Sequence, residues 1–170
     1  MIRLGGIHLI MPMAGGGSRF VQKGFDVPKP LIELNGKPFF YWAAQSIIRD
    51  IHCVDVTFVV LEQHIREHAI DAAINKFFPD AKIVAVPEVL PGAVCTCLKG
   101  IENIGDNLPV IFNDCDHMFS CSALAKRLSE NQPIDFDSAL ITFESSAAQF
   151  SYVKYDDDDN IILNMTMTTI

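Results

Sequence analysis

The residues best suited to bind an anion lie near the N-terminus. Residues 15–17 are three consecutive glycines, and Ser18 and Arg19 follow them. Such glycines let the backbone turn sharply and present bare N–H groups to an anion. Arg19 can bond two phosphate oxygens at once, and Lys29, held between two prolines, supplies a compact positive charge. Because the apolar residues 7–11 before the glycines are typical of a buried strand, the sequence predicts a site for a chain of phosphates where that strand ends.

Two common phosphate-binding motifs do not match this segment. A Walker loop places Lys and then Ser or Thr directly after its last glycine, whereas Ser18 and Arg19 stand there in this chain. A dinucleotide-binding fingerprint needs a further glycine where Phe20 is found. The P-loop and dinucleotide interpretations are therefore rejected.

The order of the segments resembles instead the N-terminal, nucleotide-binding portion of the sugar-1-phosphate nucleotidylyltransferases, also called nucleoside-diphosphate-sugar pyrophosphorylases. In that family a strand leads into a G-x-G-[ST]-R loop, followed by a P-K-P-L segment and a G-K-P turn into a helix. The corresponding residues here are 15–19, 28–31 and 36–38. All three pieces occur in the family's order.

Two later segments extend the resemblance to most of residues 7–155. Residues 86–96 are similar to the family's loop that packs a glycine, here Gly92, against the nucleobase before a helix begins. Residues 110–117 are similar to the strand whose closing aspartate, here Asp116, holds a divalent metal. The resemblance thus rests on several ordered segments.

The resemblance implies transfer of a nucleotidyl group from a nucleoside triphosphate to a sugar 1-phosphate, with release of pyrophosphate. We expect two catalytic residues: Arg19 on the β and γ phosphates, and Lys29 near the α phosphate or the pyrophosphate. The expected nucleotide-binding residues are Met13, Ala14, Gly15, Gly16, Gly17, Ser18 and Gly92. Lys37 is left out of the catalytic set, because residues 36–38 also suit a simple turn before a helix.

A magnesium ion is the expected cofactor. Mg²⁺ takes oxygen ligands, commonly one or two carboxylates together with substrate phosphates. Asp114 and Asp116 stand two apart at the end of an expected strand, so their side chains could point to the same side. The resemblance selects Asp116 as the ligand and leaves Asp114 a supporting or structural role, while a plain hydrogen bond is favoured for His117.

Alternating apolar runs and helical patterns predict an α/β fold with a mostly parallel sheet covered on both faces. The expected strands are at 7–12, 54–61, 82–86, 109–113 and 138–143, and the expected helices are at about 38–50, 63–77, 93–103 and 122–130. This order suits a Rossmann-like three-layer sandwich, the nucleotide-diphospho-sugar transferase fold that the resemblance implies.

The chain's 170 residues favour one nucleotidyltransferase domain, with a nucleotide-binding portion at about 7–145. The strand-like runs around residues 156–160 predict a hairpin with an acidic tip, whose spacing does not suit a calcium loop. Residues 150–170 would begin an incomplete sugar-phosphate-binding portion, because the family's Glu-Lys pair has no counterpart in residues 163–170. We therefore expect a chain that is truncated at its C-terminus and turns over poorly alone.

Composition excludes several classes of protein. A formal charge of −8 with 13 scattered Lys and Arg residues argues against a nucleic-acid-binding surface. No apolar run reaches the roughly 18 residues of a membrane helix, and the N-terminal apolar stretch suits a first strand better than a signal peptide, so we expect a cytoplasmic protein. Five cysteines without metal-site spacing indicate reduced thiols, with no disulfide framework and no zinc site. A homo-oligomer stays open.

Three alternatives remain at this stage. The chain could be a nucleotide-binding or regulatory module without catalysis. It could be a cytidylyltransferase that acts on an alcohol phosphate such as phosphocholine. It could also be an interaction protein that associates through an exposed strand near residues 161–165. The base and the acceptor are undetermined, and CTP, UTP and dTTP are all open.

Overall fold

The computed structural model describes residues 6–129, 138–147, 151–156 and 161–166. The chain divides into two compact units, Met1–Pro133 and Ile134–Ile170. All the predicted site residues belong to the first unit. That the two units form a single domain stays a prediction.

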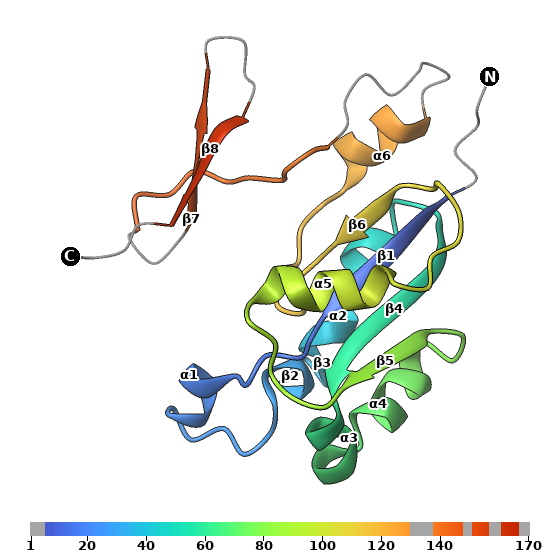
Figure 1. Ribbon diagram of the computed structural model, residues 1–170, viewed down its shortest axis with the longest axis vertical. Coiled ribbons are helices and arrows are strands. Elements are labelled where there is room, and N and C mark those ends of the chain that lie inside the picture. Colours follow the sequence, from blue (N-terminus) through green and yellow to red (C-terminus); the bar gives the residue numbers. More distant parts are fainter. Residues whose placement is uncertain (1–5, 130–137, 148–150, 157–160, 167–170) are drawn as a thin grey trace. The chain divides into compact units, whose positions relative to one another are not determined.

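The first unit is built on a parallel sheet of four strands, β1 (Ile7–Pro12), β4 (Cys53–Leu61), β5 (Lys82–Val86) and β6 (Val110–Phe112). Their order is β5-β4-β1-β6, and each neighbouring pair runs parallel (Figure 1). The central strand β1 is buried on both sides, which accounts for its apolar sequence apart from His8. The predicted parallel sheet is confirmed, with these strands within one residue of their expected bounds.

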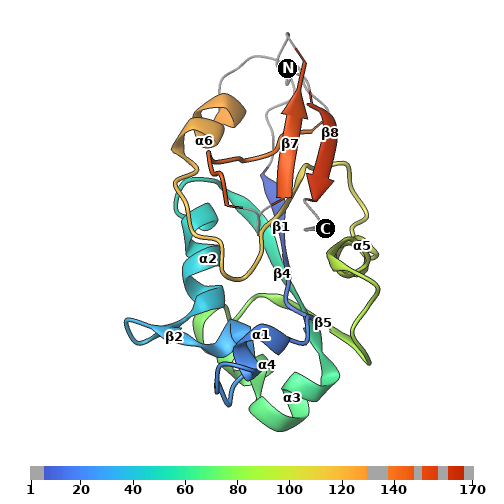
Figure 2. The ribbon, with the colours of Figure 1, turned by 90° about the vertical axis from the view of Figure 1, so that its left-hand side faces the viewer.

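Helices cover both faces of this sheet. Helices α2 (Phe39–Ile48), α4 (Ile70–Phe77) and α6 (Ser122–Ser129) contribute to one hydrophobic cluster on the sheet. Helix α5 (Ala93–Ile101) packs on β1 and β4, and Figure 2 shows it on the opposite side of the sheet from α2. The predicted three-layer arrangement is therefore confirmed.

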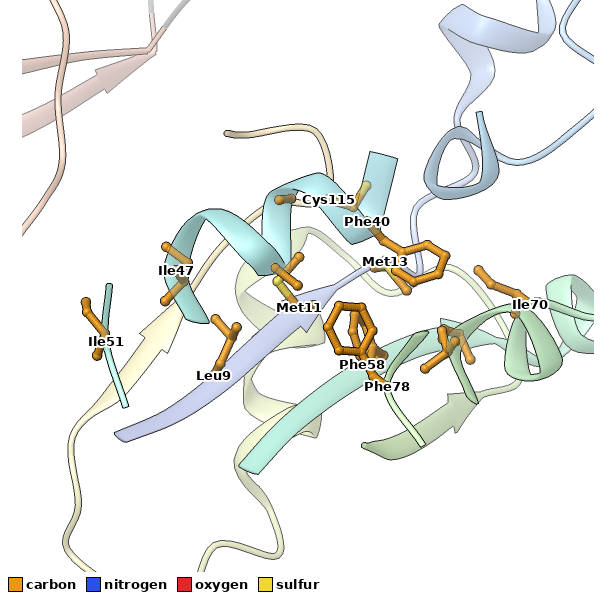
Figure 3. Close-up of a cluster of buried hydrophobic side chains, with 14 of the residues drawn as sticks. Leu9, Met11, Met13, Phe40, Ile47, Ile51, Phe58, Ile70, Phe78 and Cys115 are labelled. Carbon is orange, nitrogen blue, oxygen red and sulfur yellow. The ribbon is translucent and has the colours of Figure 1, made fainter. Parts of the chain in front are cut away.

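The larger cluster fills the space between α2 and the strands. Leu9, Met11 and Met13 alternate along and just beyond β1 so that all three face this layer, as Figure 3 shows. The ring of Phe40 from α2 is fully buried and lies 5.6 Å from the ring of Phe58, measured between centroids. This packing fixes the direction of β1, and with it the point where the glycine-rich segment leaves the sheet.

The other face of the sheet is approached very closely by α5. A Cβ atom placed on Gly100 would lie 2.4 Å from Cγ2 of Ile10 and 3.1 Å from Cγ2 of Val59. Both of these side chains are fully buried. Only glycine allows the helix backbone to lie this close to the strands.

The helix expected over residues 63–77 is wrong as a single element. The chain forms α3 (Glu62–His68) and then α4, separated by Ala69 in the left-handed region at φ 48°. The break lets Ile70 and Ile74 of α4 become fully buried in the larger cluster. Burial of these two side chains outweighs the local preference for a continuous helix, and an alanine gives no sequence signal for the turn.

In the second unit, the predicted hairpin is confirmed and the preceding strand is not. Strands β7 (Ser151–Tyr155) and β8 (Ile161–Thr166) pair antiparallel, while most of the expected acidic tip, residues 157–160, lies outside the described residues. The strand expected over 138–143 is wrong, because residues 138–147 adopt no regular secondary structure. A strand needs a neighbour for its backbone hydrogen bonds, and β7 pairs only with β8 among the described segments.

Two further expectations concern the whole chain. All five cysteines are free in the structure, and Cys115 and Cys121 are buried. Within the described ranges, no helix combines the length and the apolar character needed to cross a membrane.

Candidate active site

A cavity of about 610 Å³ lies in the first unit, where the chain leaves the carboxyl ends of β1, β5 and β6. Open parallel sheets bind their ligands at this edge. The predicted residues that line the cavity are Met13, Ala14, Gly15, Gly17, Ser18, Arg19, Lys29, Gly92, Asp114 and Asp116. Gly16 is the one predicted residue that does not line it. The fold therefore gathers residues as far apart in the chain as Met13 and Asp116.

The glycine-rich segment offers unused hydrogen-bond donors. The N–H of Met13 donates to the carbonyl of Val59 at 2.8 Å and is the last such bond to the sheet from this segment. The N–H groups of residues 14–18 donate to no other residue that the structure describes. Gly17 then takes the left-handed conformation at φ 60°, after which the short helix α1 (Ser18–Val21) begins. A run of free N–H groups beside a cavity is suited to bind phosphate oxygens.

Three cations line the cavity, and they differ in their partners. Lys29 lies in the 3-10 helix η1 (Lys29–Leu31), and its Nζ is 2.7 Å from Oδ1 of Asp116. Arg19 and Lys23 have no ion pair with any described residue. Sequence reasoning did not include Lys23, although its position one helical turn after Arg19 could have indicated it.

Asn113 holds the acidic turn after β6 in place. Its backbone N–H donates to the carbonyl of Ile10 at 3.1 Å, which extends the pairing of β6 with β1. Its side-chain Nδ2 donates to the carbonyls of Ala43 and His117, both at 3.1 Å. The turn closes with a hydrogen bond from the N–H of His117 to the carbonyl of Asp114 at 3.1 Å. Sequence reasoning missed Asn113, whose only signal was an amide residue directly after an apolar strand.

The two aspartates of this turn have different surroundings. Between them Cys115 packs into the larger cluster, and burial raises the pKa of its thiol to about 12, so it stays neutral. Asp116 is about one-third exposed and contacts Lys29. Asp114 is half exposed, and its Oδ2 lies 3.9 Å from Nδ1 of His117. These positions are compatible with Asp116 as the main ligand and Asp114 as a supporting residue.

The donor set fits magnesium better than a metal that needs a protein cage. Among the described residues, no group of three or more His, Cys, Asp or Glu side chains could hold an ion. Mg²⁺ does not require such a group, because it keeps several waters and commonly takes only one or two carboxylates beside substrate phosphates. The ammonium of Lys29 already occupies the position of a cation at Asp116. The carboxylate therefore faces a point where positive charge is stabilised.

The N-terminus of α5 forms another wall of the cavity. Gly92 precedes this helix with φ 108° and ψ 164°, a conformation that side chains with a Cβ rarely adopt. No atom lies within 4 Å of the place where its Cβ would be. Ala93 and the buried Thr96 continue the same wall. A flat ring could approach this backbone closely, and the first N–H groups of the helix favour negative charge nearby.

Lys37 lies outside the cavity. It belongs to the two-residue strand β3 (Lys37–Pro38), which pairs with β2 (Glu33–Leu34) across a tight turn. Its Nζ lies 5.2 Å from the ring centroid of Tyr41 and 4.6 Å from that of Phe77. Its ammonium therefore packs over aromatic rings at a distance from the proposed nucleotide-binding residues.

Comparisons with known proteins show what the fold of the chain is similar to. No family model and no curated protein sequence matches the chain. Among solved structures, it is similar to a nucleoside-diphosphate-sugar pyrophosphorylase from Vibrio cholerae, with TM-score 0.68, 17% identity, and coverage of 95% of this chain and 68% of that chain. It is similar to an inositol-1-phosphate CTP transferase from T. maritima, with TM-score 0.70, 16% identity, and coverage of 95% and 64%.

A nucleotidyl transferase from Methanothermobacter thermautotroptrophicus is also similar, with TM-score 0.57, 20% identity, and coverage of 75% of this chain and 58% of that chain. The chain thus spans 58% to 68% of the length of these three structures. Likeness at such identities is a likeness of fold, and it confirms at that level the resemblance seen in the sequence. The chain has the fold of the nucleotidyltransferases.

Proposed function

We propose that the cavity binds a nucleoside triphosphate with Mg²⁺ and that the chain is the nucleotide-binding part of a nucleotidyltransferase. The observation that carries this proposal is the meeting of three features at one cavity: backbone N–H groups of residues 14, 15, 17 and 18 and the guanidinium of Arg19, none of which has a partner among the described residues, and the carboxylate of Asp116. Free donors and cations suit a polyphosphate, and the carboxylate suits a metal that bridges to it. The proposed acceptor is a sugar 1-phosphate.

In the proposed reaction, an oxygen of the sugar phosphate attacks the α phosphorus and pyrophosphate leaves. The backbone of residues 14–18 and the guanidinium of Arg19 hold the β and γ phosphates and stabilise the charge that builds up on the leaving group. Lys29 neutralises the phosphate oxygens nearest the attacked atom. Asp116 and, around it, Asp114 would hold the magnesium ion, which supplies further charge neutralisation when bound.

The base would lie against the wall formed by Gly92 and Ala93. Apolar side chains of Met13, Val89 and Leu90 line the same cavity and suit the faces of a planar ring. A pyrimidine triphosphate is the proposed donor. Its identity is the first quantity to measure.

A second acceptor is favoured by one comparison. The solved structure with TM-score 0.70 is that of an inositol-1-phosphate CTP transferase, which by its name uses the phosphate of a polyol. The alternative function is therefore cytidylyl transfer to an alcohol phosphate. A third possibility, a nucleotide-binding module without catalysis, uses the same cavity.

Calorimetric titration tests the donor site. The purified chain is titrated with ATP, CTP, GTP, UTP and dTTP, each with and without Mg²⁺. We expect selective binding of one pyrimidine triphosphate, and a loss of about tenfold to hundredfold in its affinity for Arg19→Ala, because a charged hydrogen-bond donor is removed. The matched control is Arg49→Ala, since Arg49 pairs with Asp50 and does not line the cavity. The proposal is wrong if no triphosphate binds, or if both variants lose affinity equally.

Pyrophosphate release then separates the three functions. The assay uses the bound triphosphate with sugar 1-phosphates, inositol 1-phosphate or phosphocholine as acceptor. Release with one acceptor class identifies the transferase. Binding without release with any of these acceptors identifies the non-catalytic module.

A further inference from the structure

The ion pair between Lys29 and Asp116 joins two groups that the proposed function assigns to different ligands. Lys29 would contact a phosphate and Asp116 would contact the metal, yet their Nζ and Oδ1 atoms lie 2.7 Å apart. Lys29 comes from η1 and Asp116 from the turn after β6, so the pair joins two separate elements that line the cavity. Both side chains are roughly one-third exposed, which leaves the pair accessible to ligands.

Neither partner has another ion pair with a described residue. Apart from Asp116, the charged contact that Lys29 makes among the described residues is with the face of the Phe20 ring, whose centroid is 5.8 Å from its Nζ. The other cations of the cavity, Arg19 and Lys23, are unpaired within the same described part of the chain. The pairing is therefore specific to Lys29 and is not a general property of the cavity's charges.

We propose that Lys29 is a built-in counter-ion for the metal carboxylate, so that metal and nucleotide bind well only together. This inference rests on the proposed function of the same cavity. Without nucleotide, a divalent ion must displace the ammonium of Lys29 from Asp116 and then lie close to that positive charge. Without metal, a triphosphate that draws Lys29 away leaves Asp116 unpaired next to phosphate oxygens of like charge.

When both ligands are present, each takes one partner of the pair. Phosphate oxygens accept hydrogen bonds from Lys29, and the metal takes the place of the ammonium at Asp116. The number of paired charges is preserved, so neither group is left unsatisfied. The pair thus couples the two binding events through a single exchange of partners, and the coupling is reciprocal.

Two binding titrations, each with one of the two ligands alone, test the proposal without any activity measurement. In the first, Mn²⁺ alone is titrated into the chain, and the free ion is followed by electron paramagnetic resonance. Lys29→Met should bind Mn²⁺ about tenfold more tightly than the wild-type chain, because the competing charge is gone. In the second, the preferred triphosphate is titrated in the presence of EDTA, and Asp116→Asn should bind it about tenfold more tightly, because Lys29 is released.

Matched variants show that the effect passes through the pair. Lys23→Met removes the same charge from the same cavity, but Lys23 is not paired with Asp116, so Mn²⁺ affinity should change less than about twofold. Lys29→Arg keeps the charge and should restore weak Mn²⁺ binding. The double variant Lys29→Met, Asp116→Asn should not show the tighter Mn²⁺ binding of Lys29→Met, because the carboxylate is gone. Circular dichroism checks folding, and Lys29→Gln serves if Lys29→Met does not fold.

The inference is overturned if Lys29→Met binds Mn²⁺ no more tightly than the wild-type chain or the Lys23→Met variant. This result can occur while triphosphate binding remains intact and dependent on Arg19, in which case the proposed function survives. Conversely, absence of triphosphate binding overturns the proposed function, while the Mn²⁺ titration still decides whether Lys29 competes for Asp116.

Discussion

The two ends of the parallel sheet carry ion pairs of opposite character. At the amino end, Nδ1 of His8 lies 2.7 Å from Asp55 and Nε2 lies 3.0 Å from Asp106, while Lys82 bonds the other oxygen of Asp55. At the carboxyl end, Lys29 and Asp116 form one isolated pair that lines the cavity. Both sets connect segments that are distant in the sequence.

The two sets of ion pairs differ in their exposure to solvent and in the number of partners that each charged group has. The side chain of His8 is 5% exposed, and both ring nitrogens face carboxylates, which only accept hydrogen bonds. When both ring nitrogens carry a proton, each donates to one carboxylate, so the charged ring has a partner at each nitrogen. The pair at the cavity is open to solvent and leaves ligand positions free on both groups. Saturated and buried charges hold the fold, whereas accessible charges with a single partner can exchange that partner for a ligand.

Removing the buried histidine should have the largest effect. His8→Leu removes one of the two cationic partners of the largely buried Asp55 and places an apolar side chain beside it, so the free energy of unfolding should fall by about 3 kcal/mol. Urea denaturation measures this loss. Triphosphate affinity of the folded variant should stay within about twofold of wild type, because the opposite end of the sheet is unchanged. A variant with wild-type stability would contradict the structural role given to this network.

The same chemical change at both ends gives the sharpest comparison. Asp55→Asn should lower the free energy of unfolding by about 1–2 kcal/mol, since Asp55 accepts hydrogen bonds from both His8 and Lys82. Asp116→Asn should change it by less than about 0.5 kcal/mol, because its pair is accessible to water. Thermal and urea unfolding of the two variants measure both values. Equal losses of unfolding free energy in the two variants would contradict the different roles given to the ion pairs at the two ends of the sheet.

A smaller effect should appear as the pH rises. Burial by itself lowers the pKa of His8, but hydrogen bonds to Asp55 and Asp106 outweigh burial and raise it above 6.5. A raised pKa means that the protonated histidine stabilises the fold fully below 6.5 and loses this contribution as the pH rises through the pKa of the folded chain. The pKa of Asp55 is lowered, because bonds from Lys82 and His8 outweigh burial, so its contribution is lost only as the pH falls below 3.8.

Urea denaturation from about pH 6 to about pH 9 tests whether the contribution of His8 to stability falls as the pH rises. The free energy of unfolding of wild type should exceed that of His8→Gln, and this difference should become smaller as the pH rises. It should not vanish, because the neutral histidine still packs in the core. Titration of His8 by nuclear magnetic resonance gives an independent measure of its pKa. An advantage that grows with pH would contradict the assigned protonation.

Local patterns were sufficient for much of the fold and for the outline of the site. The apolar residues of β1, the glycines before Arg19 and the proline-flanked Lys29 are signals within short segments, and the structure brings them to one cavity. Asp116 was selected by the resemblance to the nucleotidylyltransferases, and the structure places it at the same cavity, at the edge where the parallel strands end. The roles of these residues remain predictions.

What could not be predicted depends on contacts across the fold. The pairing of Lys29 with Asp116, and the bonds of His8 to Asp55 and Asp106, join residues from separate elements and leave no periodic pattern. The turn at Ala69 was missed because burial of the following helix decides it. The strand expected over 138–143 failed because an apolar run cannot show whether a pairing partner exists.

The contact of Gly100 with β1 and β4 has a consequence for motion in the cavity. A helix whose backbone lies against buried strand side chains cannot slide without opening the core, so α5 and the wall at Gly92 form a rigid side. Helix α1 on the other side has no buried residue, and its backbone should exchange amide hydrogens much faster than that of α5. In the proposed function, α1 is therefore the side of the cavity that yields more easily than α5 when a ligand enters or leaves.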